Sequence, residues 1–431
     1  MSNNANLSSL TLSTGTLSPV FNSGTTSYSA NVSNATSSIT LTPTVADSNA
    51  TVTVNGLTVS SGSPSGSIAL SVGPNTITTV VTAQDGATTQ TYTVTVTRGA
   101  PLPTVTTPTS TAVTSLTATL GGNVTSDGGV TMSARGVVYS VTATNSGPQL
   151  GGTGVTNATT SGTTGVFTVP VSSLAPGTAY SFAAYATNSG GTSYTSVGTF
   201  TTLSNNASLS NLTLSSGTLA PSFSSGTTSY SASVSNATGS VTLTPTVADS
   251  NATVRVNSVI VTSGSASASI GLTLGSNVIT TLVNAQDGTT TQTYTVTVTR
   301  RSLLEDWRQT WFGTASNTGS AADTADPEHD GIPNYLEFAT NSNPTSSSSN
   351  PGHAVVNGSN IEFTYTRSKA AMTYGLTFTV EWSDTMLAGS WTSAATSETI
   401  LSEDSTVQNV KTTLPAGTNG HRFVHLSVAG P

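Results

Sequence analysis

One short acidic stretch, 326–337, holds the residues best suited to chemistry, and their spacing is that of a calcium-binding loop. Such a loop places oxygen ligands at positions 1, 3, 5, 7, 9 and 12 and a glycine at position 6, here Gly331. The expected ligands are Asp326, Glu328, Asp330, the carbonyl of Ile332, Asn334 and Glu337. Carboxylates this close together repel one another, and a hard divalent cation removes the repulsion. The spacing therefore predicts one Ca²⁺ site.

The stretch departs from a regulatory loop in several ways. Glu328 stands where the pattern has Asp or Asn, and Pro333 removes the main-chain N–H at position 8, which paired loops use to contact each other. No second loop of this kind occurs in the sequence. These departures favour a single structural site, with Asp323 as a further candidate ligand. The alternative interpretation is a solvated acidic linker that caps the helix after it.

The same stretch resembles the D-P-D-x-D-G-x-x-N-x-x-E loops of thrombospondin type 3 and dockerin-like modules. With the Trp-rich segment before it, SLLEDWRQTWFG, it also resembles a C-terminal cassette of secreted bacterial surface proteins. The resemblance implies a calcium loop, and the departures described above favour a structural site of the weak extracellular class, with a Kd of about 10⁻⁴–10⁻³ M.

Catalytic chemistry has little support. His421 and His425 lie in HRFVHLSV, which alternates like a strand and would hold them roughly 13 Å apart at ~3.3 Å per residue. The many serines include no G-x-S-x-G elbow, and Glu362 and Glu381 form no pair that can be assigned to one cleft. We predict that the chain is not an enzyme.

Three aromatic residues, Tyr374, Trp382 and Trp391, leave a binding function open. They could stack on sugar rings if they lay together on an exposed sheet. They could equally fill the core of a small sandwich, which is the interpretation we favour.

Two helices are expected to position the acidic stretch. Leu303, Leu304 and Trp307 begin a helical pattern that runs to 312, and Ser302 with Glu305 forms a capping box at its start. The second helix is expected at 333–340, with Pro333 in its first turn. A Ser-rich linker follows, and then strands to the end of the chain.

The rest of the sequence is dominated by a duplication. Residues 4–98 match residues 206–300 without a gap, and 71 of the 95 positions are identical. Both copies end in TQTYTVTVTR, whose period of two predicts a strand with Val94 and Val96 facing a core. Asp85-Gly86 lies between two alternating runs, which indicates a hairpin, and Asp47 is also expected in a turn.

Both copies resemble the bacterial cadherin-like β-sandwich repeat, in the opening LSSLTLSTGTLSPVF and the ending TYTVTVTR. The resemblance implies a seven-stranded sandwich, found as a non-catalytic module in secreted or cell-surface proteins. Residues 101–202 resemble a fibronectin type III domain in the pattern LAPGTAYSFAAYATN. There Tyr180 is expected to cap a sheet corner through its hydroxyl, and Tyr185 to lie in the core.

These observations predict a mainly β chain of tandem immunoglobulin-like sandwiches. Cadherin-like sandwiches are expected at 1–99 and 203–301 and a fibronectin type III-like sandwich at 100–202. A helix-loop-helix segment with the calcium loop and the Ser-rich linker is expected at 302–350, and a small β-sandwich at 351–431.

Composition narrows the function further. Ten Lys and Arg against 18 Asp and Glu, with a net charge of −8, cannot form the basic patch that nucleic acids require. The chain has no cysteine, no apolar run long enough to insert into a membrane, and no signal-peptide pattern at its start. Because the hydroxyl-rich repeats are typical of extracellular proteins, we expect a fragment of a longer secreted protein.

We therefore predict a structural or adhesive protein of the cell surface or extracellular space, either a stalk or a matrix component. Its expected partners are other copies of itself and cell-surface glycans or proteins. Two alternatives remain open: an accessory or carbohydrate-binding tail of a larger secreted enzyme, and a self-assembling filament subunit. In the last case a sandwich would accept a strand donated by its neighbour.

Overall fold

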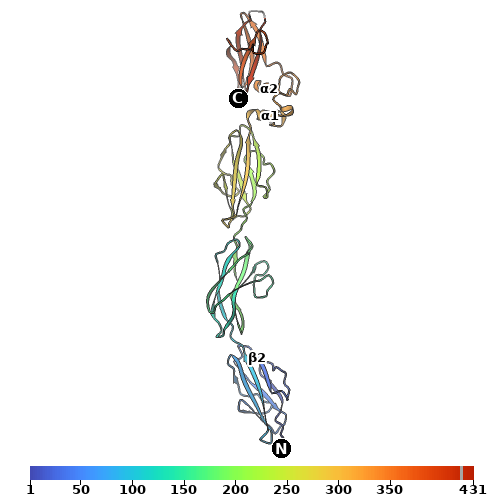
Figure 1. Cartoon of the computed structure of the whole chain (residues 1–431), viewed down its shortest axis with the longest axis vertical. Helices are drawn as coiled ribbons and strands as arrows, with labels where there is room; N and C mark the ends of the chain where they lie inside the picture. The colour runs from blue at the N-terminus through green and yellow to red at the C-terminus, as the bar shows by residue number, and fades with distance from the viewer. Residues whose placement is uncertain (418–420) are drawn as a thin grey trace. The chain divides into compact units, whose positions relative to one another are not determined.

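The computed structural model describes residues 1–417 and 421–431 and divides them into two compact units, 1–205 and 206–431. Sandwiches of paired β-sheets make up most of both units (Figure 1). No helix among the described residues has the length and apolar character that crossing a bilayer requires.

The first sandwich packs a five-stranded sheet, ordered β2-β9-β8-β5-β6, against the pairs β1-β4 and β3-β7. Its strands are β1 (Leu7–Leu12), β2 (Ser27–Val32), β3 (Ser38–Ile39), β4 (Leu41–Val45), β5 (Thr51–Val54), β6 (Leu57–Val59), β7 (Ile68–Ala69), β8 (Gly73–Thr82) and β9 (Thr89–Arg98). Residues 1–99 thus form nine strands where the resemblance implied seven, because β3 and β7 add a short pair of two residues each. The expected alternation holds in β9, where Val94 and Val96 are fully buried.

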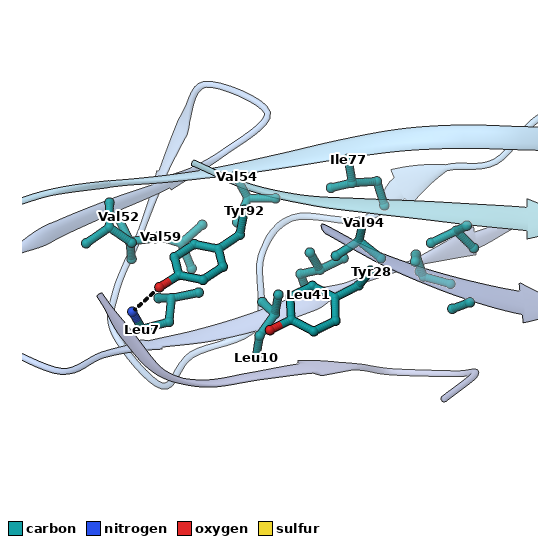
Figure 2. Packing of buried hydrophobic residues seen from close by; sticks show 14 of the residues in the cluster. Leu7, Leu10, Tyr28, Leu41, Val52, Val54, Val59, Ile77, Tyr92 and Val94 are labelled. Atoms are coloured by element: carbon teal, nitrogen blue, oxygen red, sulfur yellow. Dashed lines mark hydrogen bonds between the residues drawn. The ribbon is translucent and has the colours of Figure 1, made fainter. Parts of the chain in front are cut away.

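Two buried tyrosines fasten the loops of this sandwich to its core. The hydroxyl of Tyr92 accepts a hydrogen bond from the Leu7 N–H at 3.0 Å and donates one to the Ser23 carbonyl at 3.0 Å. Figure 2 shows this contact among the buried side chains of both sheets. The Tyr28 hydroxyl donates to the Thr25 carbonyl at 2.8 Å. These hydroxyl groups hold the loop 23–25 and the start of β1 against the core.

The third sandwich repeats the first. Its strands are β18 (Leu209–Leu214), β19 (Ser229–Val234), β20 (Ser240–Val241), β21 (Leu243–Val247), β22 (Thr253–Val256), β23 (Val259–Val261), β24 (Ile270–Gly271), β25 (Gly275–Asn284) and β26 (Thr291–Arg300). Sheet order and register correspond strand by strand, and Tyr294 again accepts from the Leu209 N–H, at 2.9 Å. Duplication of the sequence has therefore preserved both the fold and its internal hydrogen bonds.

The second sandwich has a different topology. It pairs the sheet β10-β11-β14 with a sheet of β13, β12, β15, β16 and β17. The strands are β10 (Thr104–Thr111), β11 (Ala118–Ser126), β12 (Met132–Val141), β13 (Thr156–Thr160), β14 (Gly165–Val171), β15 (Ala179–Asn188), β16 (Gly191–Tyr194) and β17 (Gly198–Thr201). The Tyr180 hydroxyl accepts from the Ala175 N–H at 2.9 Å, as expected of a corner tyrosine. Tyr185 is buried, but in a separate cluster with Val138 and Ala183.

The last part of the chain combines three helices with a sandwich. Its elements are α1 (Leu303–Phe312), the 3₁₀ turn η1 (Gly319–Ala321), α2 (Asn334–Thr340), β27 (Gly352–Asn357), β28 (Asn360–Ser368), α3 (Lys369–Tyr374), β29 (Thr377–Ser383), β30 (Ser397–Glu403), β31 (Val407–Pro415) and β32 (Phe423–Ala429). Ser302 and Glu305 form the predicted capping box. α2 starts one residue later than predicted, because Pro333 is its N-cap.

The helices do not form a separate core. Leu304 of α1 and Phe338 of α2 are buried in one cluster with Ala371 of α3 and Leu376, which belong to the C-terminal sandwich. In the same first turn, α1 is also fastened to the third sandwich. There Asp306 accepts hydrogen bonds from the Asn236 N–H and, at 2.6 Å, from Arg301 Nε. Helix α1, which precedes the acidic stretch, is therefore held both by the third sandwich and by the C-terminal part of the chain.

Candidate metal centre

Three carboxylates of the acidic stretch converge. Asp326, Glu328 and Asp330 each offer a carboxylate oxygen, and these oxygens lie within 4.8 Å of one another. The loop bends sharply around them, since His329 and Gly331 both adopt positive φ angles of 62° and 88°. A glycine suits the second of these positions because it lacks a Cβ. The predicted convergence of positions 1, 3 and 5 is present.

Main-chain N–H groups hold two of these carboxylates in place. Asp326 accepts from the Asp330 N–H at 3.1 Å and from the Gly331 N–H at 2.8 Å. Asp330 Oδ1 accepts from the Ile332 N–H at 2.8 Å. The N–H donors of Ser348 and Ile332 lower the pKa of Asp330, the former more strongly, so this carboxyl is ionised at neutral pH. The side chain of Ile332 is buried, and its carbonyl stays a predicted ligand.

Helix α2 supplies two more oxygen-bearing side chains. Asn334 and Glu337 are three residues apart, which places them on one face of the helix, and both are essentially inaccessible, at 1% and 0% exposure. The Asn334 amide donates to the carbonyls of Ser320 and Ala322, at 2.8 and 2.7 Å. Because both N–H groups are used on η1 and the residue after it, the orientation of the amide is fixed and its oxygen points elsewhere.

Five buried side-chain oxygens at this place have no hydrogen-bond partner. They are both carboxylate oxygens of Glu328, both of Glu337 and Oδ1 of Asn334. Burying an acceptor without a partner costs about 1–3 kcal/mol, and more for a charged group. Burial, followed by the charges of Glu328, Asp330 and Asp326, raises the pKa of Glu337 to about 8. The site thus requires either a bound proton or a bound cation.

The donor set fits one kind of cation. All the available ligands are oxygens of carboxylates, an amide and the main chain, which suit a hard ion such as Ca²⁺, whereas zinc sites use mainly nitrogen and sulfur. The five unpartnered oxygens come from positions 3, 9 and 12 of the predicted loop. These residues are the ones that would hold the ion, together with Asp326 and Asp330.

The further candidate ligand, Asp323, is hydrogen-bonded to residues outside the loop. Its two carboxylate oxygens accept hydrogen bonds from Arg308 at 2.6 Å and from Asn317 at 2.9 Å. Both oxygens are therefore engaged away from the loop. Sequence reasoning missed Arg308, which is buried on α1 and fixes the segment before the loop. Its position could have indicated this burial, because Arg308 lies four residues after Leu304, on the apolar face of the helix.

The three candidate sugar-stacking residues do not form one platform. Tyr374 packs edge-on against Phe338 among the helices. Trp382 lies partly in the sandwich core, with the Arg422 guanidinium 3.5 Å from its ring centre. Trp391 lies over the ring of His425, at 4.0 Å between ring centres. Each aromatic ring thus has a different surrounding and a partner of its own.

Comparison with known proteins identifies the two repeats. Residues 7–99 and 209–301 match the family described as the cadherin-like beta sandwich domain. The chain therefore contains two cadherin-like domains, as the sequence resemblance indicated. Domains of this family are typically non-catalytic, and the remaining residues, including the acidic stretch, lie outside the match.

One curated relative and several solved structures are also similar. A "Putative membrane protein" of Evansella cellulosilytica is 44% identical over 87 residues, which are 20% of this chain and 13% of that relative. Domains A168–A170 of titin align with 38% of this chain and 57% of theirs, at 14% identity and a TM-score of 0.25. Domains FN1–FN3 of chicken CNTN1 align with 39% of this chain and 63% of theirs, at 12% identity and a TM-score of 0.20.

Proposed function

We propose that this chain is a non-catalytic, structural part of an extracellular or cell-surface protein, in which β-sandwiches serve as spacers or adhesive modules. Two cadherin-like domains and their mutual identity support this role. In the first three sandwiches, the few acidic residues lie in turns. Asp85, for example, accepts from the N–H groups of Ala87 and Thr88 at 2.9 and 2.8 Å.

We further propose that residues 326–337 bind one Ca²⁺ ion, which stabilises the helices and the C-terminal sandwich together. The observation that carries this proposal is the set of five buried, unpartnered oxygens on Glu328, Asn334 and Glu337. A bound cation would replace their missing partners and offset the repulsion among four carboxylates. The role proposed for the ion is structural.

Thermal unfolding in calcium and in chelator tests the calcium proposal. We expect the wild-type chain to unfold at a higher temperature in Ca²⁺, because the ion binds the folded loop and not the unfolded chain. Glu337→Gln should lose this response while remaining folded in chelator, since the amide removes a buried charge. Asp404→Asn, in an exposed turn of the same unit, is the matched control and should respond like wild type. Identical melting of the wild type in both conditions contradicts the proposal.

A further inference from the structure

We infer that Ser348, in the Ser-rich linker, is a positioning residue for the metal loop and that it couples cation binding to the docking of this linker on that loop. The inference rests on the proposed calcium site and adds to it a residue that orients one of the ligands. The sequence gives no hint of this role, because Ser348 is one of four consecutive serines, 346–349, in a segment expected to be flexible.

The two oxygens of Asp330 face different parts of the chain. Oδ1 accepts from the Ile332 N–H within the loop at 2.8 Å. Oδ2 accepts two hydrogen bonds from Ser348, from its N–H at 2.6 Å and from its hydroxyl at 3.0 Å. A carboxylate held on both oxygens cannot rotate freely. Ser348, 18 residues further along the chain, therefore helps to set the orientation of a predicted ligand.

The surroundings show why this contact matters. A cavity of about 310 Å³ separates the loop from the sandwich. It is lined by the loop residues 330–332, the linker residues 350–352 and, on β32, the residues 424–426. Side chains do not fill this space. The two hydrogen bonds from Ser348 to Asp330 lie beside the cavity and join the loop to the linker that leads into β27.

Thermodynamic linkage gives the coupling its direction. Outer partners that orient a ligating carboxylate typically change metal affinity by 10–100-fold when they are removed. The effect is reciprocal, so a cation that favours the bonded orientation of Asp330 must favour the docked linker by the same factor. Calcium would thus order residues 345–351, which precede β27, as well as the loop itself.

The test measures both sides of this linkage on the full chain. Ca²⁺ affinity is measured by calorimetry, and hydrogen exchange of 345–351 is followed by mass spectrometry in calcium and in chelator. Ser348→Ala should weaken Ca²⁺ binding by about 10-fold and remove most of the calcium-dependent protection of the linker. Ser348→Thr keeps both hydrogen-bond donors and should retain both the Ca²⁺ affinity and the calcium-dependent protection of the linker. Ser349→Ala, which changes a serine without a hydrogen bond to Asp330, should behave like wild type.

Each outcome decides between the proposals. Wild-type affinity in Ser348→Ala, or linker exchange that calcium does not change, overturns the inference and leaves the calcium site standing. If the wild-type chain itself binds no calcium, the proposed site fails. A loss of affinity in Ser348→Ala that Ser348→Thr restores, with unchanged unfolding in chelator, supports a positioning role over a general loss of stability.

Discussion

Two threonines in the sandwich cores carry buried hydroxyl groups without a hydrogen-bond partner. Thr79 and its counterpart Thr281 are both 0% exposed, and the Oγ1 atom of each is unpaired. Each lies on the core-facing side of a ten-residue strand, β8 or β25. The buried residues two positions before and after it are isoleucine and valine. Each of the two repeats is thus destabilised by one buried, unpaired hydroxyl group.

Replacing these hydroxyls should stabilise both repeats. Thr79→Val and Thr281→Val preserve the shape of the side chain and remove the unpaired group, so we expect a gain of about 1 kcal/mol in the free energy of unfolding of each domain. Denaturant unfolding of each variant measures it. Thr95→Val, on the outward side of β9, is the control and should change stability little. A loss of stability in the core variants would mean that the hydroxyl has a partner in solution.

A second residue-scale prediction concerns pH. The pKa of Glu337 is raised from its ordinary value of 4.5 to about 8. The folded chain therefore keeps a proton that the unfolded chain releases. In chelator, this contribution to the stability of residues 302–431 is fully present below pH 4.5 and is lost as the pH rises to about 8.

The pH dependence should change when calcium is added, because the cation takes the place of the proton. Thermal unfolding at a series of pH values, in chelator and in excess Ca²⁺, checks this expectation. The fall in stability between pH 4.5 and 8 should be smaller in calcium, and Glu337→Gln should not show it in either condition. An equal fall in the variant would assign the titration to another group.

At the scale of elements, tyrosine hydroxyls decide how loops and first strands are attached. Tyr92→Phe leaves the Leu7 N–H and the Ser23 carbonyl without their partner and should cost about 2 kcal/mol. Tyr180→Phe removes one bond, from the Ala175 N–H, and should cost about 1 kcal/mol. Denaturant unfolding of the two variants gives the comparison. Equal stability of Tyr180→Phe and wild type would remove the corner role.

Regular elements were predictable from the sequence where a periodic pattern marks them. β9 follows from the alternation around Val94, and α1 from its capping box at Ser302. Helix α3 was not predicted, because its six residues, KAAMTY, are too few to show a helical period. β27 escaped because it lies at a sheet edge, where most of its side chains are exposed and do not alternate.

The ligands of the candidate site were predictable from the sequence, but the contacts that fix them were not. The ligand spacing is local in the sequence, so Asp326, Glu328 and Asp330 could be named before their geometry was known. The contacts that fix the site come from elsewhere: Arg308 takes Asp323, η1 holds the Asn334 amide, and Ser348 holds Asp330. No sequence pattern links these partners, since the two members of each pair lie 12 to 18 residues apart and meet only in the fold.

At the scale of the whole molecule, the described strands favour a chain that does not assemble by strand exchange. β1 is paired with β4 of its own domain, and Ser2 before it is bonded to Gln84, so this strand is not free for donation. At one edge of the large sheets, β6 and β23 have three residues each, which limits pairing at that edge; the strands at the opposite edge, β2 and β19, have six.

We therefore expect a monomer of about 43.1 kDa by light scattering, both in calcium and in chelator. Larger species in either condition would instead support the filament interpretation, and calcium-dependent ones would place the contact near the loop. Measurement at several protein concentrations separates weak association from a stable assembly.

The hydrophobic cluster that α1 and α2 share with α3 limits where gene rearrangements can divide this part of the chain. Leu304 and Phe338 have their apolar partners Ala371 and Leu376 on the far side of the Ser-rich linker. A gene rearrangement that cut within this linker would leave both halves with exposed apolar surface. We therefore expect residues 302–431 to be inherited as one cassette, although the linker resembles a boundary between domains.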